Sequence, residues 1–147
     1  MITVTNLTKT FHTGEHTLIA LDHLSFTINE GEFLAITGRS GAGKSTLLYQ
    51  LSLLDHPTNG EIKIDGQETS SLHIAERVAY RRNHFGFIFQ DYALLPSLTA
   101  LENVMLPLLM QGASRHDAQQ KAQKALIQVE LEEKYENLPS QLSGGQQ

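Results

Sequence analysis

Short runs of strand-forming residues dominate the first part of the chain. They predict five strands, at Ile2–Thr8, Leu24–Ile28, Glu32–Thr37, Glu61–Ile64 and Phe85–Gln90. The fourth run is followed by an Asp-Gly pair, residues 65 and 66, which favours a hairpin turn. The amino-terminal part of the chain is therefore expected to form a sheet.

After the third predicted strand in the sequence, the spacing of hydrophobic residues changes from that of a strand to that of a helix. Leucines recur at Leu47, Leu48, Leu51 and Leu54, and Pro57 marks where this helix should end. The spacing predicts one helix with a leucine-rich face.

The second half of the chain is predicted to be helical. Thr99 is a candidate cap for a short helix that holds Leu101, Val104 and Met105. Ser114, with Asp117 three residues later, resembles a capping box at the start of another helix. An apolar stripe on that helix is expected to pack, and its members are Ala118, Ala122, Ala125, Leu126 and Val129. Strands first and helices later favour an α/β core followed by a helical subdomain.

The composition is that of a globular domain, and it excludes several classes of function. The 147 residues include 40% hydrophobic and 18% charged residues. A formal net charge of −5 argues against a general binder of nucleic acid or anionic membrane, since both need cationic surface. The sequence has no cysteine, which excludes disulfides and thiolate chemistry. No apolar run is long enough to span a bilayer, and the first residues lack the apolar core of a signal peptide.

One segment predicts a specific chemistry. Residues 38–45, GRSGAGKS, fit the phosphate-binding pattern G-x-x-x-x-G-K-[ST]. Glycines let the backbone adopt otherwise strained dihedrals and approach a ligand closely, and the N–H groups of such a loop can surround phosphates. The residues expected to form this phosphate loop are Gly38, Arg39, Ser40, Gly41, Ala42 and Gly43.

The three residues that follow the loop in the sequence have separate expected roles. Lys44 supplies a mobile charge for the β- and γ-phosphates, the Ser45 hydroxyl is placed to bind Mg²⁺, and Thr46 can donate to the α-phosphate. The helix that starts near Lys44 directs its positive end at the ligand. The alternative is a glycine-rich turn with a surface lysine, but the preceding strand and following helix favour nucleotide binding. The motif alone does not choose among kinases, GTPases and transport ATPases.

Two further segments indicate which class of nucleotide-binding protein the sequence resembles. Residues 87–108, FIFQDYALLPSLTALENVMLPL, and residues 142–147, LSGGQQ, accompany the phosphate loop. Together they resemble the ATP-binding subunits of ABC transporters, most of all the branch that serves lipoprotein-releasing and macrolide-exporting systems. The resemblance runs through the chain from about Ile2, and LSGGQ is specific to the ABC superfamily.

The resemblance implies a P-loop NTPase fold of the ABC ATPase type. It places an α/β core with an antiparallel β subdomain at about residues 1–90, and a helical subdomain at about residues 91–147. The family continues past LSGGQ with a strand that ends in Asp-Glu and, later, a switch histidine. These have no counterpart in the 147 residues. We therefore expect the C-terminal part of the core to be missing, no catalytic residue in this sequence, and negligible ATP hydrolysis if this is the complete polypeptide.

The resemblance also assigns site residues outside the phosphate loop. Phe11 stands where the family places an aromatic ring against adenine, with a core phenylalanine on an edge strand as the alternative. Gln90 matches the glutamine that binds Mg²⁺ or the attacking water, with a polar residue that merely ends a strand as the alternative. The signature residues are implied to close over nucleotide held by a second subunit, and they are Leu142, Ser143, Gly144, Gly145 and Gln146.

The expected function is that of an ATP-binding subunit of an ABC transporter. It binds Mg-ATP, pairs with a second ATP-binding subunit in a homo- or heterodimer, and couples hydrolysis to a membrane permease of the export or extraction type. The expected cofactors are ATP and Mg²⁺, and no nucleic-acid partner is expected. The expected location is cytoplasmic, at the inner face of the cell membrane through the permease. The alternatives are a nucleotide- or partner-binding module without turnover, and a soluble ABC ATPase that acts outside transport.

Overall fold

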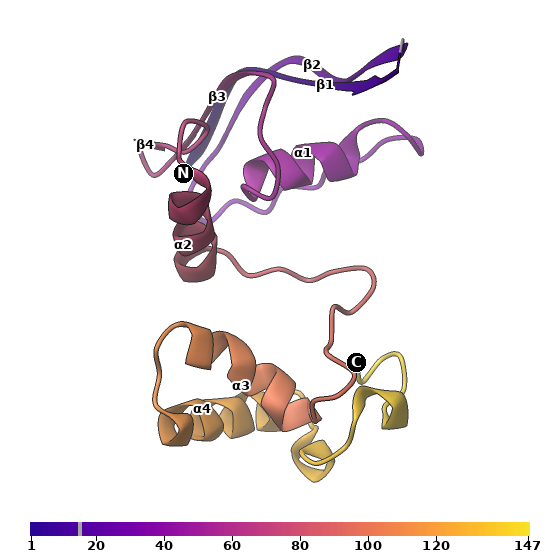
Figure 1. Ribbon diagram of the computed structural model, residues 1–147, viewed down its shortest axis with the longest axis vertical. Helices are drawn as coiled ribbons and strands as arrows, with labels where there is room; N and C mark the ends of the chain where they lie inside the picture. The colour runs from indigo at the N-terminus through magenta and orange to yellow at the C-terminus, as the bar shows by residue number, and fades with distance from the viewer. Residues whose placement is uncertain (15) are drawn as a thin grey trace. The chain divides into compact units, whose positions relative to one another are not determined.

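Two long antiparallel strands, β1 (Ile2–Thr13) and β2 (His16–Ile28), organise the amino-terminal part of the computed structural model, which describes residues 1–14 and 16–147 (Figure 1). The described chain divides into two compact units, Met1–Arg81 and Arg82–Gln147. Both strands are longer than their predicted runs. In β1 the added residues, 9–13, are partly or fully exposed. In β2 the added residues, 16–23, include the buried Leu21, which the predicted run missed.

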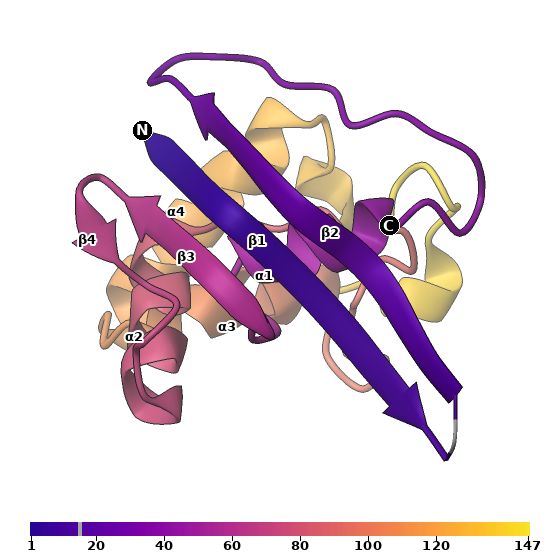
Figure 2. The same ribbon diagram turned by 90° about the horizontal axis from the view of Figure 1, so that it is seen from above.

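The sheet of the first unit is antiparallel and has the order β2-β1-β3-β4. Figure 2 shows β1 between β2 and β3 (Asn59–Ile64), with the short β4 (Gln67–Glu68) at the edge. The predicted hairpin turn between β3 and β4 is confirmed. Asp65 and Gly66 have φ angles of 49° and 81°, the left-handed pair that a tight two-residue turn requires.

One face of this sheet packs on α1 (Lys44–Leu51), which lies beside it in Figure 1. Of the predicted leucine stripe, Leu47 and Leu51 are buried, whereas Leu48 and Leu54 are exposed. The helix ends at Leu51, earlier than Pro57, because the chain turns at the buried Leu53 with a left-handed φ of 59°. The remaining core comes from strand residues, namely Val4, Leu7, Leu21, Ile62 and Ile64.

Two of the five predicted strands are wrong. Residues 32–37 and 85–90 form no ladder with any part of the chain that the structure describes, and Phe33 and Ile88 are almost fully exposed. The segment at residues 85–90 is extended, since Phe85, Phe87 and Phe89 place their rings in a row with centroids 6.0 and 5.6 Å apart. A strand needs a hydrogen-bonded neighbour as well as suitable residues, and apolar composition does not supply one.

The helix α2 (Ile74–His84) carries the chain from the first unit into the second. The second unit contains α3 (Ala100–Met110), α4 (Arg115–Gln128) and two short 3₁₀ turns, η1 (Glu132–Lys134) and η2 (Pro139–Gln141). None of the helices in residues 1–14 and 16–147 has both the length and the apolar character needed to cross a membrane.

Both predicted helix caps are present in the second unit. The Thr99 hydroxyl accepts a hydrogen bond from the Glu102 N–H at 3.2 Å, and the Glu102 carboxylate accepts one from the Thr99 N–H at 2.9 Å. The Ser114 hydroxyl likewise accepts from the Asp117 N–H at 3.1 Å and donates to the Asp117 carboxylate at 2.7 Å. That hydrogen bond lowers the pKa of the Asp117 carboxyl, although the side chain is exposed. Local sequence alone therefore specified where these helices begin.

The predicted stripe on α4 is only partly correct. Ala118, Ala122 and Leu126 are buried against α3, whereas Ala125 and Val129 are exposed. The buried three are spaced four residues apart and follow a single row along the helix. The row that begins at Ala125 is turned away from α3, because α3 covers only a narrow stripe of α4.

Two substitutions on α4 test this assignment. Ala122→Leu inserts a larger side chain at a fully buried position, so we expect it to lower the free energy of unfolding by about 1–3 kcal/mol. Ala125→Leu, one turn away on the exposed row, should change it by less than about 0.5 kcal/mol. Urea unfolding followed by circular dichroism measures both. Equal losses would show that both rows of α4 are packed.

Candidate nucleotide-binding site

The phosphate loop is held in place by a close approach to strand β2. Gly43, the residue before α1, has a left-handed φ of 82°. A Cβ atom built on Gly43 would lie 2.4 Å from the backbone oxygen of Ala20, well inside van der Waals contact. Only glycine permits both this backbone conformation and this distance. The loop therefore sits against β2 because of one residue that the motif specifies.

The start of α1 presents unpaired backbone donors. The first N–H groups of a helix have no partner within it, and no side chain caps this one. The first turn also holds no acidic residue that would compensate the positive end of the helix. The arrangement is that of an anion-binding helix terminus preceded by a glycine-rich loop.

The ammonium group of Lys44 lies over this loop. Its Nζ donates to the backbone oxygen of Gly38 at 2.9 Å and to that of Arg39 at 2.8 Å. A phosphate oxygen is a stronger partner for an ammonium than a neutral carbonyl, because the hydrogen bond is then charged on both sides. Lys44 is thus poised to exchange its carbonyl contacts for a bound phosphate.

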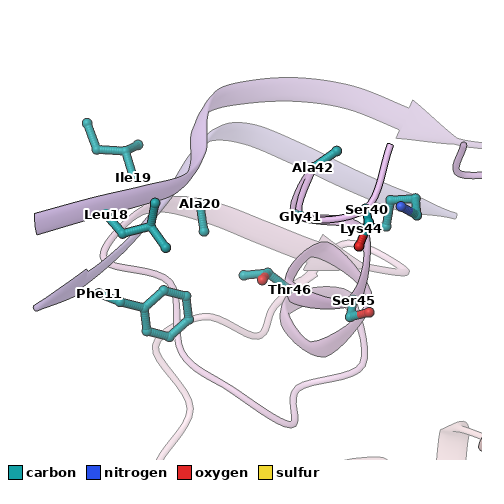
Figure 3. A pocket seen from close by; sticks show the side chains of 11 residues that line it. Phe11, Leu18, Ile19, Ala20, Ser40, Gly41, Ala42, Lys44, Ser45 and Thr46 are labelled. Atoms are coloured by element: carbon teal, nitrogen blue, oxygen red, sulfur yellow. The ribbon is translucent and has the colours of Figure 1, made fainter. Parts of the chain in front are cut away.

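A cavity of about 520 Å³ connects this loop to the hairpin of β1 and β2 (Figure 3). The hairpin contributes apolar side chains at one side, and the loop contributes backbone donors and hydroxyl groups at the other. The lining residues are Phe11, Leu18, Ile19, Ala20, Ser40, Gly41, Ala42, Gly43, Lys44, Ser45 and Thr46. The volume lies in the range of small-molecule sites, and the lining suits a ligand with a flat apolar part and an anionic part.

The cavity brings together most of the residues that the sequence assigned to nucleotide binding. Phe11 lies in it and is 41% exposed, so it is not buried in the core. Gly38 and Arg39 take part through the carbonyl groups that hold Lys44.

Three lining residues, Leu18, Ile19 and Ala20, were not anticipated. They lie on the strand that pairs with β1, where Leu18 is opposite Phe11. The apolar run in HTLIALD, residues 16–22, could have indicated that β2 begins earlier, but the predicted strand began only at Leu24.

Gln90 and the signature residues belong to the second unit, so their predicted roles toward the nucleotide stay predictions. Gln90 is exposed, in a turn that directly follows the row of phenylalanine rings.

The signature forms a single helical turn. The Ser143 carbonyl accepts from the N–H groups of Gln146 and Gln147 at 2.9 and 3.0 Å, and Gln146 Oε1 accepts from the Ser143 N–H at 3.0 Å. Leu142 is buried and anchors the turn. No acceptor within residues 1–14 and 16–147 pairs with the N–H groups of Gly144 and Gly145. A Cβ on Gly144 would lie 3.0 Å from the Tyr92 hydroxyl, so a side chain there would crowd that ring.

A model of the ABC transporter family matches residues 21–147. The chain belongs to the ABC transporter family. It is 48% identical, over all 147 residues, to the lipoprotein-releasing system ATP-binding protein LolD of Zymomonas mobilis. It is also 44% identical over the same length to the macrolide export ATP-binding/permease protein MacB of Burkholderia pseudomallei. The family and the branch predicted from the sequence motifs are thereby confirmed.

The fold is likewise that of an ABC cassette. The solved dimer of the ATP-binding cassette MJ0796, in a post-hydrolysis state bound to ADP and Pi, matches 99% of this chain with a TM-score of 0.91 and 45% identity. The predicted ABC ATPase fold, with an antiparallel sheet and separate helices, is confirmed. The chain spans 63% of the LolD relative, 22% of the MacB relative and 65% of the MJ0796 chain.

The close approach at Gly43 is testable with a matched pair of glycines. Gly41 and Gly43 have φ angles of 80° and 82°, but a Cβ at Gly41 would meet nothing within 4 Å. We expect Gly41→Ala to cost about 1 kcal/mol of stability from its left-handed backbone. Gly43→Ala should cost about 1–3 kcal/mol more, because the methyl group collides with Ala20. Thermal unfolding without nucleotide measures the difference, and equal midpoints would contradict the proposed loop–strand contact.

Proposed function

We propose that this protein is the ATP-binding component of an ABC transporter and that it binds Mg-ATP in the cavity between the hairpin and the phosphate loop. The observation that carries this proposal is the placement of Phe11 and the free N–H groups of α1 on the same cavity. The aromatic side suits the adenine ring, since base–aromatic stacking contributes about 1–3 kcal/mol per base. The helix terminus and Lys44 suit the triphosphate.

The metal would be held by hydroxyl and amide oxygens. Ser45 lines the cavity directly after Lys44, and a hydroxyl is a hard ligand of the kind that Mg²⁺ accepts alongside phosphate oxygens and water. Gln90 is the proposed second protein ligand. Bound Mg²⁺ would neutralise charge on the β- and γ-phosphates during hydrolysis. The residues of this chain then bind and orient the nucleotide.

The signature turn is proposed to act on a nucleotide held by a second subunit. Its exposed Gly144 and Gly145 N–H groups and its Ser143 hydroxyl offer donors to a γ-phosphate. Support comes from MJ0796, whose solved structure is a dimer bound to ADP and Pi. A γ-phosphate that contacts both subunits would favour the closed dimer, and its loss on hydrolysis would remove that preference.

The partner is proposed to be a membrane permease of an export or extraction system. The LolD relative is an ATP-binding protein of a lipoprotein-releasing system, and the MacB relative combines ATP-binding and permease parts. Hydrolysis of ATP would then drive the permease from a position at the cytoplasmic face of the membrane. One relative is named for lipoprotein release and the other for macrolide export, which supports the proposed direction of transport.

The first test removes the ammonium group from the phosphate loop. Lys44→Ala should weaken Mg-ATP binding by roughly 10- to 100-fold, which corresponds to one charge-assisted hydrogen bond. Lys63→Ala is the control, because Lys63 lies on β3, pairs with Glu61 at 3.4 Å and is half exposed. Isothermal titration calorimetry measures both. Unchanged affinity in Lys44→Ala would contradict the nucleotide site.

The second test concerns the signature turn. Ser143→Arg places a large side chain beside the exposed glycine N–H groups, so it should abolish ATP-dependent dimerisation while leaving ATP binding to the single subunit within about twofold. Gln120→Arg adds the same charge on the exposed face of α4 and should dimerise normally. Analytical ultracentrifugation with and without Mg-ATP distinguishes the two. A dimer of normal affinity in Ser143→Arg would contradict the proposed role in the partner's site.

A further inference from the structure

Lys9 connects the aromatic ring in the cavity to the turn that follows α1. Its Nζ lies 2.7 Å from Asp55 Oδ2 and donates to the backbone oxygen of His56 at 2.7 Å. The same nitrogen lies over the ring of Phe11, 5.1 Å from its centroid. The Lys9 side chain is only 13% exposed, so its charge is largely removed from water and fixed by these contacts.

The carboxylate that holds Lys9 also holds the phosphate-loop helix. Asp55 Oδ2 accepts from Gln50 Nε2 of α1 at 2.9 Å, and Oδ1 accepts from the His56 N–H at 2.7 Å. Gln50 is fully buried. Burial raises the pKa of the Asp55 carboxyl, but the hydrogen bonds and charge of its partners outweigh burial and lower the pKa below its ordinary value. The carboxylate is therefore charged when it binds Lys9.

The turn that carries Asp55 is itself held by two arginines of α2. The backbone oxygen of Leu53 accepts from Arg77 Nη2 at 2.7 Å and from Arg81 Nη1 at 2.8 Å. Arg77 also donates to the backbone oxygen of Asp55 and is 5% exposed. The anchor for Lys9 is thus ordered before any ligand binds, because neighbouring elements fix both the carboxylate and its backbone.

We propose that Lys9 is a positioning residue for nucleobase recognition, which it achieves by fixing the Phe11 ring through a cation–π contact anchored on Asp55. This inference rests on the proposed nucleotide site. An ammonium over one face of the ring occupies that face and leaves the other face for the base. An ordered ring also loses less conformational freedom when the base stacks on it.

The inference predicts a loss that depends on the base and not on the phosphates. Lys9 contacts Phe11, Asp55 and His56, and it is not among the residues that line the cavity. Its removal should therefore weaken binding of ATP, which carries adenine, and leave binding of inorganic triphosphate unchanged. A residue needed only for the fold would lower both affinities together.

The experiment compares ATP and inorganic triphosphate as ligands of the purified protein by calorimetry with Mg²⁺. Lys9→Met should weaken ATP binding about three- to tenfold and change triphosphate binding by less than about twofold. In a Phe11→Ala background, Lys9→Met should add less than about twofold, because its effect passes through the ring. Lys63→Met, a substitution of the half-exposed lysine on β3, is the matched control and should change neither affinity.

Equal losses for ATP and triphosphate, no loss for either ligand, or an undiminished effect in the Phe11→Ala background would each overturn the role of Lys9. If the wild-type protein binds neither ligand, it is the proposed nucleotide site that fails. Thermal unfolding shows whether each variant is folded at the assay temperature. Should Lys9→Met be unfolded, Lys9→Gln serves in its place, because it removes the charge over the ring while leaving Asp55 and its bond to Gln50 unchanged. It should give the same loss for ATP alone.

Discussion

The contact between Gly43 and the backbone of Ala20 determines where the helix α1 starts relative to the hairpin of β1 and β2. A Cβ at Gly43 would lie 2.4 Å from the Ala20 oxygen, so the loop and the strand approach as closely as two backbones can. This approach brings the unpaired N–H groups of α1 onto the same cavity as Phe11. A larger residue would move the phosphate half of the cavity away from its apolar half. A ligand that needs both halves depends on this one backbone contact.

Elements that depend on neighbours close in sequence were predictable, and those that depend on distant pairing were not. The caps at Thr99 and Ser114 and the turn at Asp65-Gly66 involve residues one to three positions apart, and all three are present. Residues 32–37 and 85–90 have the composition of buried strands, yet whether such a segment forms a strand depends on a hydrogen-bonded neighbour. Sequence pattern measures the tendency to be buried and contains no information on that neighbour.

The same distinction between local and distant contacts applies to the candidate site. The phosphate loop is contiguous, so its spacing alone identified the glycines and Lys44. The apolar half comes from two strands, and Leu18 reaches the cavity because it is paired with Phe11. The contact between Lys9 and Asp55 belongs to no sequence motif, because the two residues lie on either side of α1 in the sequence. Contacts of this kind have no fixed spacing, so they become visible only when the strand register and the turn after α1 are known.

This division has a physical reason. Backbone N–H groups bind phosphate whatever the neighbouring side chains are, so a short loop with the right glycines can carry the phosphate half unaided. A flat base offers only a face to stack on, and the ring that meets it must be held by packing around it. Here that support comes from one carboxylate oxygen of Asp55, which accepts from Lys9 beside the ring and from Gln50 on the phosphate-loop helix. Because both halves of the cavity share this oxygen, we expect a disturbance at Asp55 to reach the phosphate-loop helix and the ring together, and a disturbance at Lys9 to reach the ring alone.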